Sequence, residues 1–300
     1  MPTSSIEPMR LNELDGWIIR HGEQEVRVLA QGAQVISYRV GDAPPIIWLS
    51  EEAAYAAGQS VRGGVPVCWP WFGDLTRNNQ AVQNHFQAQV APAHGLVRGV
   101  PWTLQALEYD EHAAYLRLGL DTRQQPLVDW PHACSLSLEV RVAEQLTLTL
   151  TSQNHNPYPL HLSQALHTYL AVGDIHCAQV QGLDGCQYLD ALDNWQTRTQ
   201  VGPILFHSET DRVYQDVPSH LSVIDPTWNR RIHLRTDGSS SAVVWNPWIE
   251  KSLRLSQFAP DAWQRMLCVE SANIVQDTIE LSEGQRHTLS VHISSQPLTD

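Results

Sequence analysis

The sequence predicts an all-β protein, a large antiparallel β-sandwich, and three features of its 300 residues support that prediction. Segments that are β-rich or that alternate apolar and polar residues recur along nearly the whole chain. Clusters of Gly, Pro, Asn and Asp separate them, as turns between strands would. Helical periodicity is scarce. Many strands can cover one another only as a sandwich or barrel, so we expect one domain, residues 1–300, built from two packed, twisted sheets.

The expected strands can be placed in chain order. They are residues 25–30, 33–40, 113–120, 134–142, 144–154, 163–174, 175–183, 220–225, 230–236, 241–248, 264–271, 277–282 and 287–294. In residues 144–154, Leu146, Leu148 and Leu150 alternate with threonines, which is the pattern of a strand with one buried face. Helical character is limited to residues 50–58 and a short turn at 260–264.

Composition and charge limit the classes of partner. Apolar residues make up 42% and charged residues 17% of the chain, which indicates a globular protein with an ample core. The formal net charge of -13 argues against nucleic acid or an anionic membrane as a partner, since both need a cationic surface. Lys251 is the single lysine among 19 basic residues, so bidentate recognition of phosphate or carboxylate by arginine is chemically available.

The cysteines and the N-terminus bear on the compartment. The chain has five cysteines and no CxxC pair, which predicts neither a disulfide framework nor a structural zinc site. The first residues lack a basic start followed by an apolar core, and no apolar run approaches the ~20 residues of a membrane helix. We therefore expect a cytoplasmic protein with reduced thiols.

A histidine in the middle of an expected strand is the first candidate functional residue. In residues 163–174, His167 shares a strand face with small or polar neighbours that include Ser163, Ala165 and Tyr169. Small neighbours leave room for a ligand, so the position suggests the floor of a cleft. A solvated sheet face would give the same pattern.

Two loops and one more strand contain further candidates. Residues 61–74 combine paired glycines, two prolines and two tryptophans, and they fit a packed cover loop as well as a binding loop. His94 and Arg98 lie four residues apart in a Gly/Pro-rich connector, which is weak evidence alone. Glu270 lies in an otherwise apolar strand, where a carboxylate needs a partner or a function.

Other readings of the polar residues carry less support. Glu209, Asp211 and Arg212 are most simply explained as a salt-bridged surface turn. The histidines at 155, 161 and 167 have the same strand parity, but neighbours would lie roughly 20 Å apart, which is too far for one metal ion. No phosphate-loop, dinucleotide or serine-elbow motif is present, so a nucleotide cofactor or a covalent hydrolase has no support.

Five strings occur in an order that resembles a known family. "RGGVPVCWPWFG", "HGLVR", "ALHTY", "VVWNPW" and "CVES" are similar to the hexose-6-phosphate mutarotases, or glucose-6-phosphate 1-epimerases, a branch of the aldose 1-epimerase family. The resemblance covers nearly the whole chain after the first few residues, and the first and third strings are the most specific. It implies a galactose mutarotase-like β-sandwich whose sugar lies in an open cleft on one sheet.

The resemblance also assigns roles to residues of this chain. It implies that His167 and Glu270 are the catalytic pair, and that His94 and Asp211 contact the sugar. Arg62 and Arg98 match phosphate-binding positions. The sequence departs from the family pattern at Ala93, where many relatives carry glutamine, and at Ser271 and Ala272, where the eukaryotic pattern is Pro-Gly.

The implied reaction interconverts the α and β anomers of a hexose 6-phosphate, with glucose 6-phosphate as the expected substrate. Opening the ring requires one group to take the O1 proton while another protonates O5, so Glu270 is expected to act as base and His167, with a reference pKa of ~6.5, as acid.

We expect no cofactor, no metal and a monomer. Trp69 or Trp71 would either face the sugar or pack, and Lys251 is expected on the solvated surface. The alternatives are an aldose 1-epimerase for unphosphorylated sugars and a non-catalytic phosphosugar-binding protein.

Overall fold

A nine-stranded antiparallel sheet forms one layer of the computed structural model, which describes residues 3–298. Its order is β16-β13-β18-β19-β23-β9-β8-β7-β6. The strands are β6 (Thr103–Tyr109), β7 (Ala114–Asp121), β8 (Cys134–Val142), β9 (Leu146–Asn154), β13 (Gln179–Gln181), β16 (Ile204–Leu205), β18 (His220–Asp225), β19 (Arg230–Asp237) and β23 (Arg286–Pro297). Alternate residues of β8 are buried and the others are not, so one face of this sheet packs on the core while the other meets solvent.

An eight-stranded sheet contacts the nine-stranded sheet where β21 meets β23, and it carries the candidate site. Its order is β15-β14-β17-β20-β21-β11-β5, with β12 also paired to β21. The strands are β5 (Val67–Cys68), β11 (Gln164–Leu166), β12 (Tyr169–Ala171), β14 (Gln187–Asp190), β15 (Gln196–Thr199), β17 (Thr210–Gln215), β20 (Ser241–Asn246) and β21 (Met266–Asn273). Every residue of β20 and β21 is buried, so these central strands are covered on both faces.

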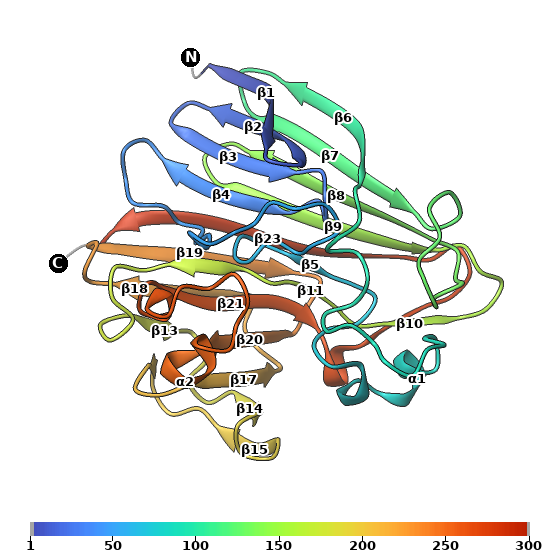
Figure 1. The fold of residues 1–300 in the computed structure, drawn as a ribbon. Helices are drawn as coiled ribbons and strands as arrows, with labels where there is room; N and C mark the ends of the chain where they lie inside the picture. Colours follow the sequence, from blue (N-terminus) through green and yellow to red (C-terminus); the bar gives the residue numbers. More distant parts are fainter. Residues whose placement is uncertain (1–2, 299–300) are drawn as a thin grey trace.

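A third sheet extends the second layer. It has the order β1-β2-β3-β4 and consists of β1 (Ser4–Leu11), β2 (Leu14–His21), β3 (Gln24–Leu29) and β4 (Val35–Val40). Its strands contact β6, β7 and β8, and a bridge between Val35 and Val65 links its last strand to the segment before β5. Figure 1 shows these blue strands beside the green ones. The predicted antiparallel sandwich is therefore confirmed.

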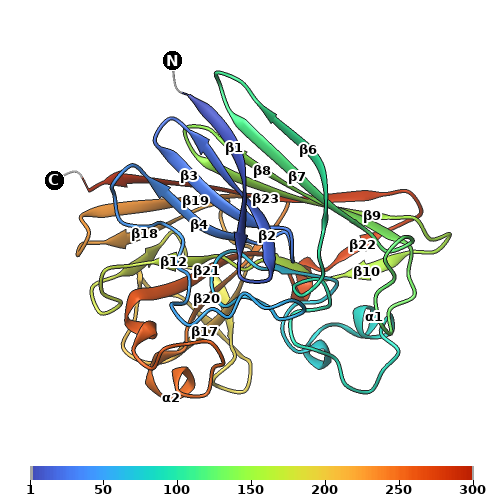
Figure 2. The ribbon, with the colours of Figure 1, turned by 45° about the horizontal axis from the view of Figure 1, so that its top comes forward.

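The remaining elements are short. A two-stranded sheet joins β10 (Leu160–Leu162) to β22 (Ile279–Leu281), and the helices are α1 (Gln80–Gln83), α2 (Trp248–Ser252) and 3-10 turns at Leu75–Arg77, Ala262–Arg265 and Val275–Asp277. Helix α2 and β17 lie at the end of the molecule away from β1 (Figure 1, Figure 2). Among residues 3–298, no helix has both the length and the apolar character needed to cross a membrane.

The structure differs from the sequence prediction in several elements. Residues 50–58 form turns and loops rather than a helix, whereas the turn near residue 262 is present. The expected strand 175–183 is reduced to three residues, and residues 61–74 contribute a two-residue ladder strand, β5, that pairs with β11. The expected strand 163–174 is split in two, which shapes the candidate site.

Candidate active site

A break between β11 and β12 places His167. Both short strands pair with β21 in the same register, with Leu166 opposite Ser271 and Tyr169 opposite Cys268, and regular pairing lapses only at the two residues between them. The backbone N–H of His167 donates instead to the carbonyl of Pro66 at 3.0 Å. The predicted continuous strand is therefore wrong at this point. The imidazole of His167 lies beside the side chains of Cys268 and Glu270 on β21.

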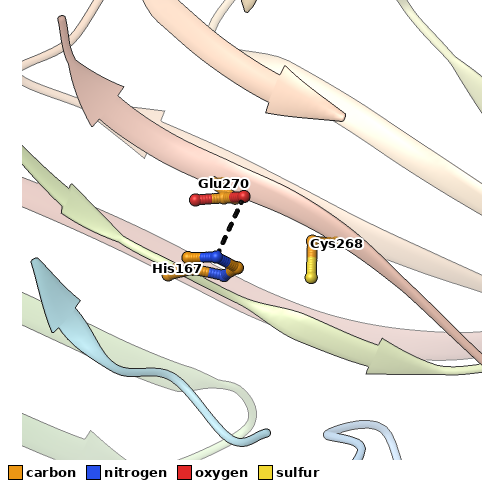
Figure 3. A group of neighbouring side chains, drawn as sticks. All are labelled: His167, Cys268 and Glu270. Carbon is orange, nitrogen blue, oxygen red and sulfur yellow. Dashed lines mark ion pairs between the residues drawn. The ribbon is translucent and has the colours of Figure 1, made fainter. Parts of the chain in front are cut away.

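His167 and Glu270 form a buried pair. Nε2 of His167 lies 3.4 Å from Oε1 of Glu270, and the two side chains are only 10% and 1% exposed. Figure 3 shows the imidazole and the carboxyl group turned toward each other. The other polar atoms, Nδ1 of His167 and Oε2 of Glu270, have no hydrogen-bond partner among the described residues. Unpaired buried polar atoms are costly, and a bound hydroxyl-rich ligand can satisfy them.

Burial disfavours charge on both members of the pair. It raises the pKa of Glu270 well above its usual value, with the nearby Asp211 carboxylate adding to the effect. Burial also lowers the pKa of His167 well below its usual value, and His94, Arg98 and Arg62 push in the same direction. Both shifts work against a carboxylate beside an imidazolium, which is the form in which Glu270 is the base and His167 the acid. The assignment of those two roles stays a prediction.

Aromatic side chains enclose the imidazole. The ring of Tyr169 is stacked on it, with centroids 4.7 Å apart and planes 10° from parallel. Trp245 lies edge-on to it at 6.4 Å, and Phe72 is tilted by 40° at 6.3 Å. They exclude water from the histidine and offer apolar surface to a ligand. Trp69 and Trp71 are 0% and 1% exposed, so they pack in the core. Trp245, from the string "VVWNPW", is the cleft residue that sequence reasoning left without a role.

A contact with the loop of residues 61–74 leaves one ring nitrogen of His94 as a hydrogen-bond donor. Its Nδ1 accepts from the backbone N–H of Gly73 at 3.3 Å and lies 3.4 Å from Sγ of Cys68. Burial, followed by Arg98, Arg62 and Lys251, lowers the pKa of His94 to about 3, so the ring is neutral near pH 7. A neutral imidazole whose Nδ1 accepts carries its proton on Nε2.

Two arginines lie at the His167 side of the cleft. Arg62 donates to the carbonyl of Ser256 at 3.3 Å and to the hydroxyl of Tyr169 at 3.5 Å. Arg98 donates to the carbonyl of Ala93 at 2.5 Å, and its Nε is buried without a partner. Within residues 3–298 neither arginine has a carboxylate partner, so both guanidinium charges are available to an anion.

Asp211 and Lys251 lie on the other side of the pair. Asp211 is on β17, and its carboxylate lies 3.5 Å from Nζ of Lys251, which also contacts Glu209 at 3.1 Å. Lys251 comes from α2 and its charge lies over the ring of Trp245. Asp211 lines the cleft, as the resemblance implied, rather than forming part of a plain surface turn. The expectation that Lys251 lies on the solvated surface is corrected, because Lys251 also lines the cleft. Burial raises the pKa of Asp211, and Lys251 partly offsets this.

These residues line one cleft of about 620 Å³. Its lining includes all six residues that the sequence singled out: Arg62, His94, Arg98, His167, Asp211 and Glu270. The order of strands in the sheet sets their order across the floor, from Asp211 on β17 through Glu270 on β21 to His167 beside β11, with the arginine loops beyond. A ligand that spans the cleft thus meets an acidic wall, the pair, and then two cations.

Three side chains at the pair could offer ligands to a metal ion. His167, Cys268 and Glu270 offer atoms within 4.8 Å of one another (Figure 3). Burial and the neighbouring Glu270 raise the pKa of the Cys268 thiol well above its usual value. The reaction proposed below uses only His167 and Glu270 of this group.

Comparisons with known proteins identify relatives. A family model described as "Aldose 1-epimerase" matches residues 16–294. A protein of Escherichia coli K12 named "Putative glucose-6-phosphate 1-epimerase" is 32% identical over 265 residues, covering 88% of this chain and 84% of that one. The crystal structure of a "putative mutarotase" from Salmonella typhimurium has a TM-score of 0.84 at 27% identity, over 98% of this chain and 94% of that one. A galactose mutarotase-like protein from Clostridium acetobutylicum, 11% identical with a TM-score of 0.76 over 98% and 99% of the two chains, shares the fold.

Proposed function

Because the chain belongs to the aldose 1-epimerase family, we propose that it interconverts the α and β anomers of a hexose 6-phosphate, with glucose 6-phosphate as the expected substrate. One observation carries the choice of a phosphorylated sugar: Arg62 and Arg98 face the same cleft as His167 and Glu270, and no described carboxylate neutralises them. The name of the Escherichia coli relative supports the same substrate.

Ring opening needs a base at O1 and an acid at O5. With the sugar lying across the pair, the Glu270 carboxylate takes the proton of the C1 hydroxyl while Nε2 of His167 gives a proton to the ring oxygen. The C1 to O5 bond breaks and leaves an aldehyde and a C5 hydroxyl. After rotation about the C1 to C2 bond, His167 takes back the C5 hydroxyl proton as O5 attacks C1, and Glu270 returns its proton to O1. The pair ends each turnover as it began.

The remaining cleft residues hold C1 against the pair. The Nε2–H of His94 would donate to a sugar hydroxyl, since its Nδ1 is engaged by Gly73. Asp211 would accept from a hydroxyl on the far side of the ring. Arg62 and Arg98 would bind the phosphate through charge-assisted hydrogen bonds. Positioning of this kind contributes much of the rate enhancement, since a small displacement of C1 from the pair lowers the rate of ring opening.

The test is anomer exchange measured by two-dimensional exchange NMR, with glucose 6-phosphate and glucose in parallel, with and without the protein. Faster exchange of glucose 6-phosphate than of glucose supports the proposal. Equal acceleration of both sugars would identify an aldose 1-epimerase for unphosphorylated sugars. Binding of the phosphosugar without any acceleration would identify a non-catalytic binding protein.

Substitution of one arginine tests the phosphate role separately. Arg98→Ala should weaken the apparent affinity for glucose 6-phosphate far more than that for glucose, because only the first carries a phosphate. The matched control is Arg117→Ala, which removes a surface arginine paired with Glu139. Equal losses for the two sugars would contradict an anion site at Arg98.

A further inference from the structure

The two cleft arginines lie close to one end of the catalytic pair. The Tyr169 hydroxyl that accepts from Arg62 belongs to the ring stacked on His167. The loop of Arg98 also carries His94, whose ring centroid is 5.3 Å from that of His167. Glu270 enters from β21, on the opposite side of the imidazole from the arginine loops. The positive charges are therefore arranged around the histidine end of the pair.

The charges act unequally on the two ends of the pair. The groups that face His167 are Glu270 and Cys268 from β21, Tyr169 from β12, and His94, Arg62 and Arg98 from the loops. Both arginines contribute to lowering the pKa of His167, after burial and His94. The segment that carries Arg62 pairs with the far side of the His167 strand from β21, since the backbone N–H groups of His167 and Tyr169 donate to Pro66 and Gly64. The guanidinium groups are therefore nearer the imidazole than the carboxyl group, and they oppose the imidazolium more strongly than they favour the carboxylate.

We propose that the phosphate of the substrate activates the catalytic pair in addition to anchoring the sugar. By neutralising Arg62 and Arg98, the phosphate dianion allows the shared proton to move from Oε1 of Glu270 to Nε2 of His167. The product of this transfer is a carboxylate beside an imidazolium, which is the form that opens the ring. One O–H bond breaks and one N–H bond forms, and no proton is exchanged with solvent. The inference rests on the proposed function, since it concerns the same site.

The proposal predicts an effect of the phosphate on kcat as well as on KM. A phosphate that only anchored the sugar would lower KM and leave kcat unchanged, because it would stabilise ground state and transition state equally. A phosphate that also sets the proton position raises kcat. An unphosphorylated sugar would meet the pair mostly in its inactive form, so selectivity for phosphosugars would exceed what the phosphate contacts alone provide.

The first experiment supplies the anion and the sugar as separate molecules. Sulfate is used as the probe because it is a dianion and too weak a base to catalyse mutarotation itself. With the full-length protein and saturating glucose, sulfate should raise kcat by roughly ten- to a hundredfold, as expected for cancelling charges near an ionisable group. Exchange without protein at each sulfate concentration is the control. No activation, or inhibition, would overturn the proposal.

The second experiment removes one positive charge permanently. Arg98→Gln should increase kcat for glucose several-fold and reduce the response to sulfate, while binding of glucose 6-phosphate weakens. Arg117→Gln, at a surface pair with Glu139, is the matched control and should change neither quantity. A fall in kcat for glucose in the Arg98 variant would contradict the proposal, because a purely structural or anchoring arginine gives no gain.

A spectroscopic measurement follows the proton directly in the unmodified protein. The ¹⁵N shifts of the His167 ring, assigned by comparison with His167→Asn, should move toward the imidazolium pattern when sulfate is added. Shifts that stay at the neutral pattern in saturating sulfate would overturn the proposal. Mutarotation of glucose 6-phosphate without any sulfate effect would overturn this inference alone. Failure to accelerate either sugar would overturn the proposed function and this inference with it.

Discussion

Glu270 shows how one residue of the site opposes stability. Its carboxyl group is buried in a strand whose residues are all buried, and its Oε2 has no hydrogen-bond partner among the described residues. Such a group is expensive to desolvate, so its presence costs folding free energy. The compensation is chemical, because a carboxyl group with a raised pKa is a stronger base once ionised and can exchange a proton with His167 and with a sugar hydroxyl.

Replacing this carboxyl group should therefore stabilise the protein while it removes activity. In the unfolded chain the Glu270 carboxyl ionises near its usual pKa, whereas in the folded protein it ionises at higher pH. Unfolding thus releases a proton, and this group lowers stability increasingly as pH rises above about 4.5. Glu270→Gln lacks that penalty, so its Tm should exceed that of the parent by roughly 3 °C or more at pH 8, and by less near pH 5. Mutarotation should fall by about 10²- to 10⁴-fold.

The measurement is thermal unfolding of both proteins from pH 5 to pH 8, with exchange NMR for activity. A Tm difference that shrinks as pH rises would contradict the assigned direction of the pKa shift. Near-normal turnover of Glu270→Gln would rule out Glu270 as the base. His167→Asn should also lose most activity, and sugar binding should change only modestly in both variants.

Lys251 is expected to control the ionisation of Asp211. Burial raises the pKa of this carboxyl group and the ammonium of Lys251 opposes the shift, so Lys251→Met should raise the pKa further. A higher pKa leaves Asp211 protonated at low pH, where it can no longer accept as a carboxylate. The acidic limb of the kcat/KM profile should therefore move to higher pH, with roughly tenfold lower activity on that limb.

The control for this prediction is Lys251→Arg, which keeps the charge and should keep the limb close to its original position. Glu209→Gln is an opposite test, because it removes a carboxylate that raises the pKa of Asp211 and should move the limb to lower pH. Superimposable pH profiles for the parent and Lys251→Met would show that Lys251 has only a structural role.

At the level of elements, sequence patterns worked where one strand face meets solvent. The strands β8 and β18 begin and end at the predicted residues, and Leu146, Leu148 and Leu150 are fully buried as their alternation predicted. In the eight-stranded sheet the pattern is weaker because β20 and β21 are buried on both faces. The strands β14, β15 and β16 were missed because they are too short to show a period. The longer strands β1, β2 and β6 were also missed, and neither β1 nor β6 has a buried residue that would give it an apolar face.

The helix expected at residues 50–58 failed because tertiary contacts outweigh propensity. Backbone N–H groups of this stretch donate to side chains from distant segments: Ala54 to Gln257, Ala57 to Glu13 and Gly58 to Gln31. A helix of this length gains little from its own hydrogen bonds, so these contacts decide the conformation.

The site was predictable only in part. The family strings located six residues that the fold brings to one cleft. The contact between Lys251 and Asp211 joins residues forty positions apart through α2 and β17, and no sequence period encodes such a pairing. The lapse in pairing at His167 and Thr168 was also not predicted, because the alternation of residues 163–174 continues through it without a change.

The loop that carries His94 depends on a glycine. Gly95 has a φ of +76°, and a Cβ at this position would lie 2.0 Å from the carbonyl oxygen of Trp69. Gly95→Ala must therefore shift backbone, which should destabilise the protein by about 3 kcal/mol or more and displace His94. Gly284→Ala is a matched control: its φ is +74°, but a Cβ there meets nothing within 4 Å, so about 1 kcal/mol is expected.

Urea unfolding measures both free energies, and exchange NMR measures the sugar reaction. Under conditions in which both variants are fully folded, only Gly95→Ala should lose activity, because Gly284 lies in a turn before β23 and not in the loop that carries His94. Equal free-energy losses in the two variants would mean that the close approach to Trp69 is relieved without consequence.

At the scale of the whole molecule, the three large sheets share one core. A single cluster of buried apolar side chains includes Ile19 and Tyr38 from the four-stranded sheet, Leu138 from the nine-stranded sheet, and Leu267 from the eight-stranded sheet. The bridge between Val35 and Val65 also ties the first sheet to the segment that carries Arg62. The structure thus gives the N-terminal strands a part in supporting the cleft.

This shared core makes a prediction about domain organisation, which remains to be tested. Since no sheet can unfold without exposing the apolar face of another, residues 1–300 should unfold as one cooperative domain, with equal calorimetric and van't Hoff enthalpies. Sedimentation at the same concentration should give a monomer, as the sequence led us to expect. Glucose 6-phosphate binds only the folded protein in our proposal, so it should raise the Tm of the whole transition as its concentration increases. Two transitions, of which the ligand moves only one, would instead show that the four-stranded sheet unfolds independently of the cleft.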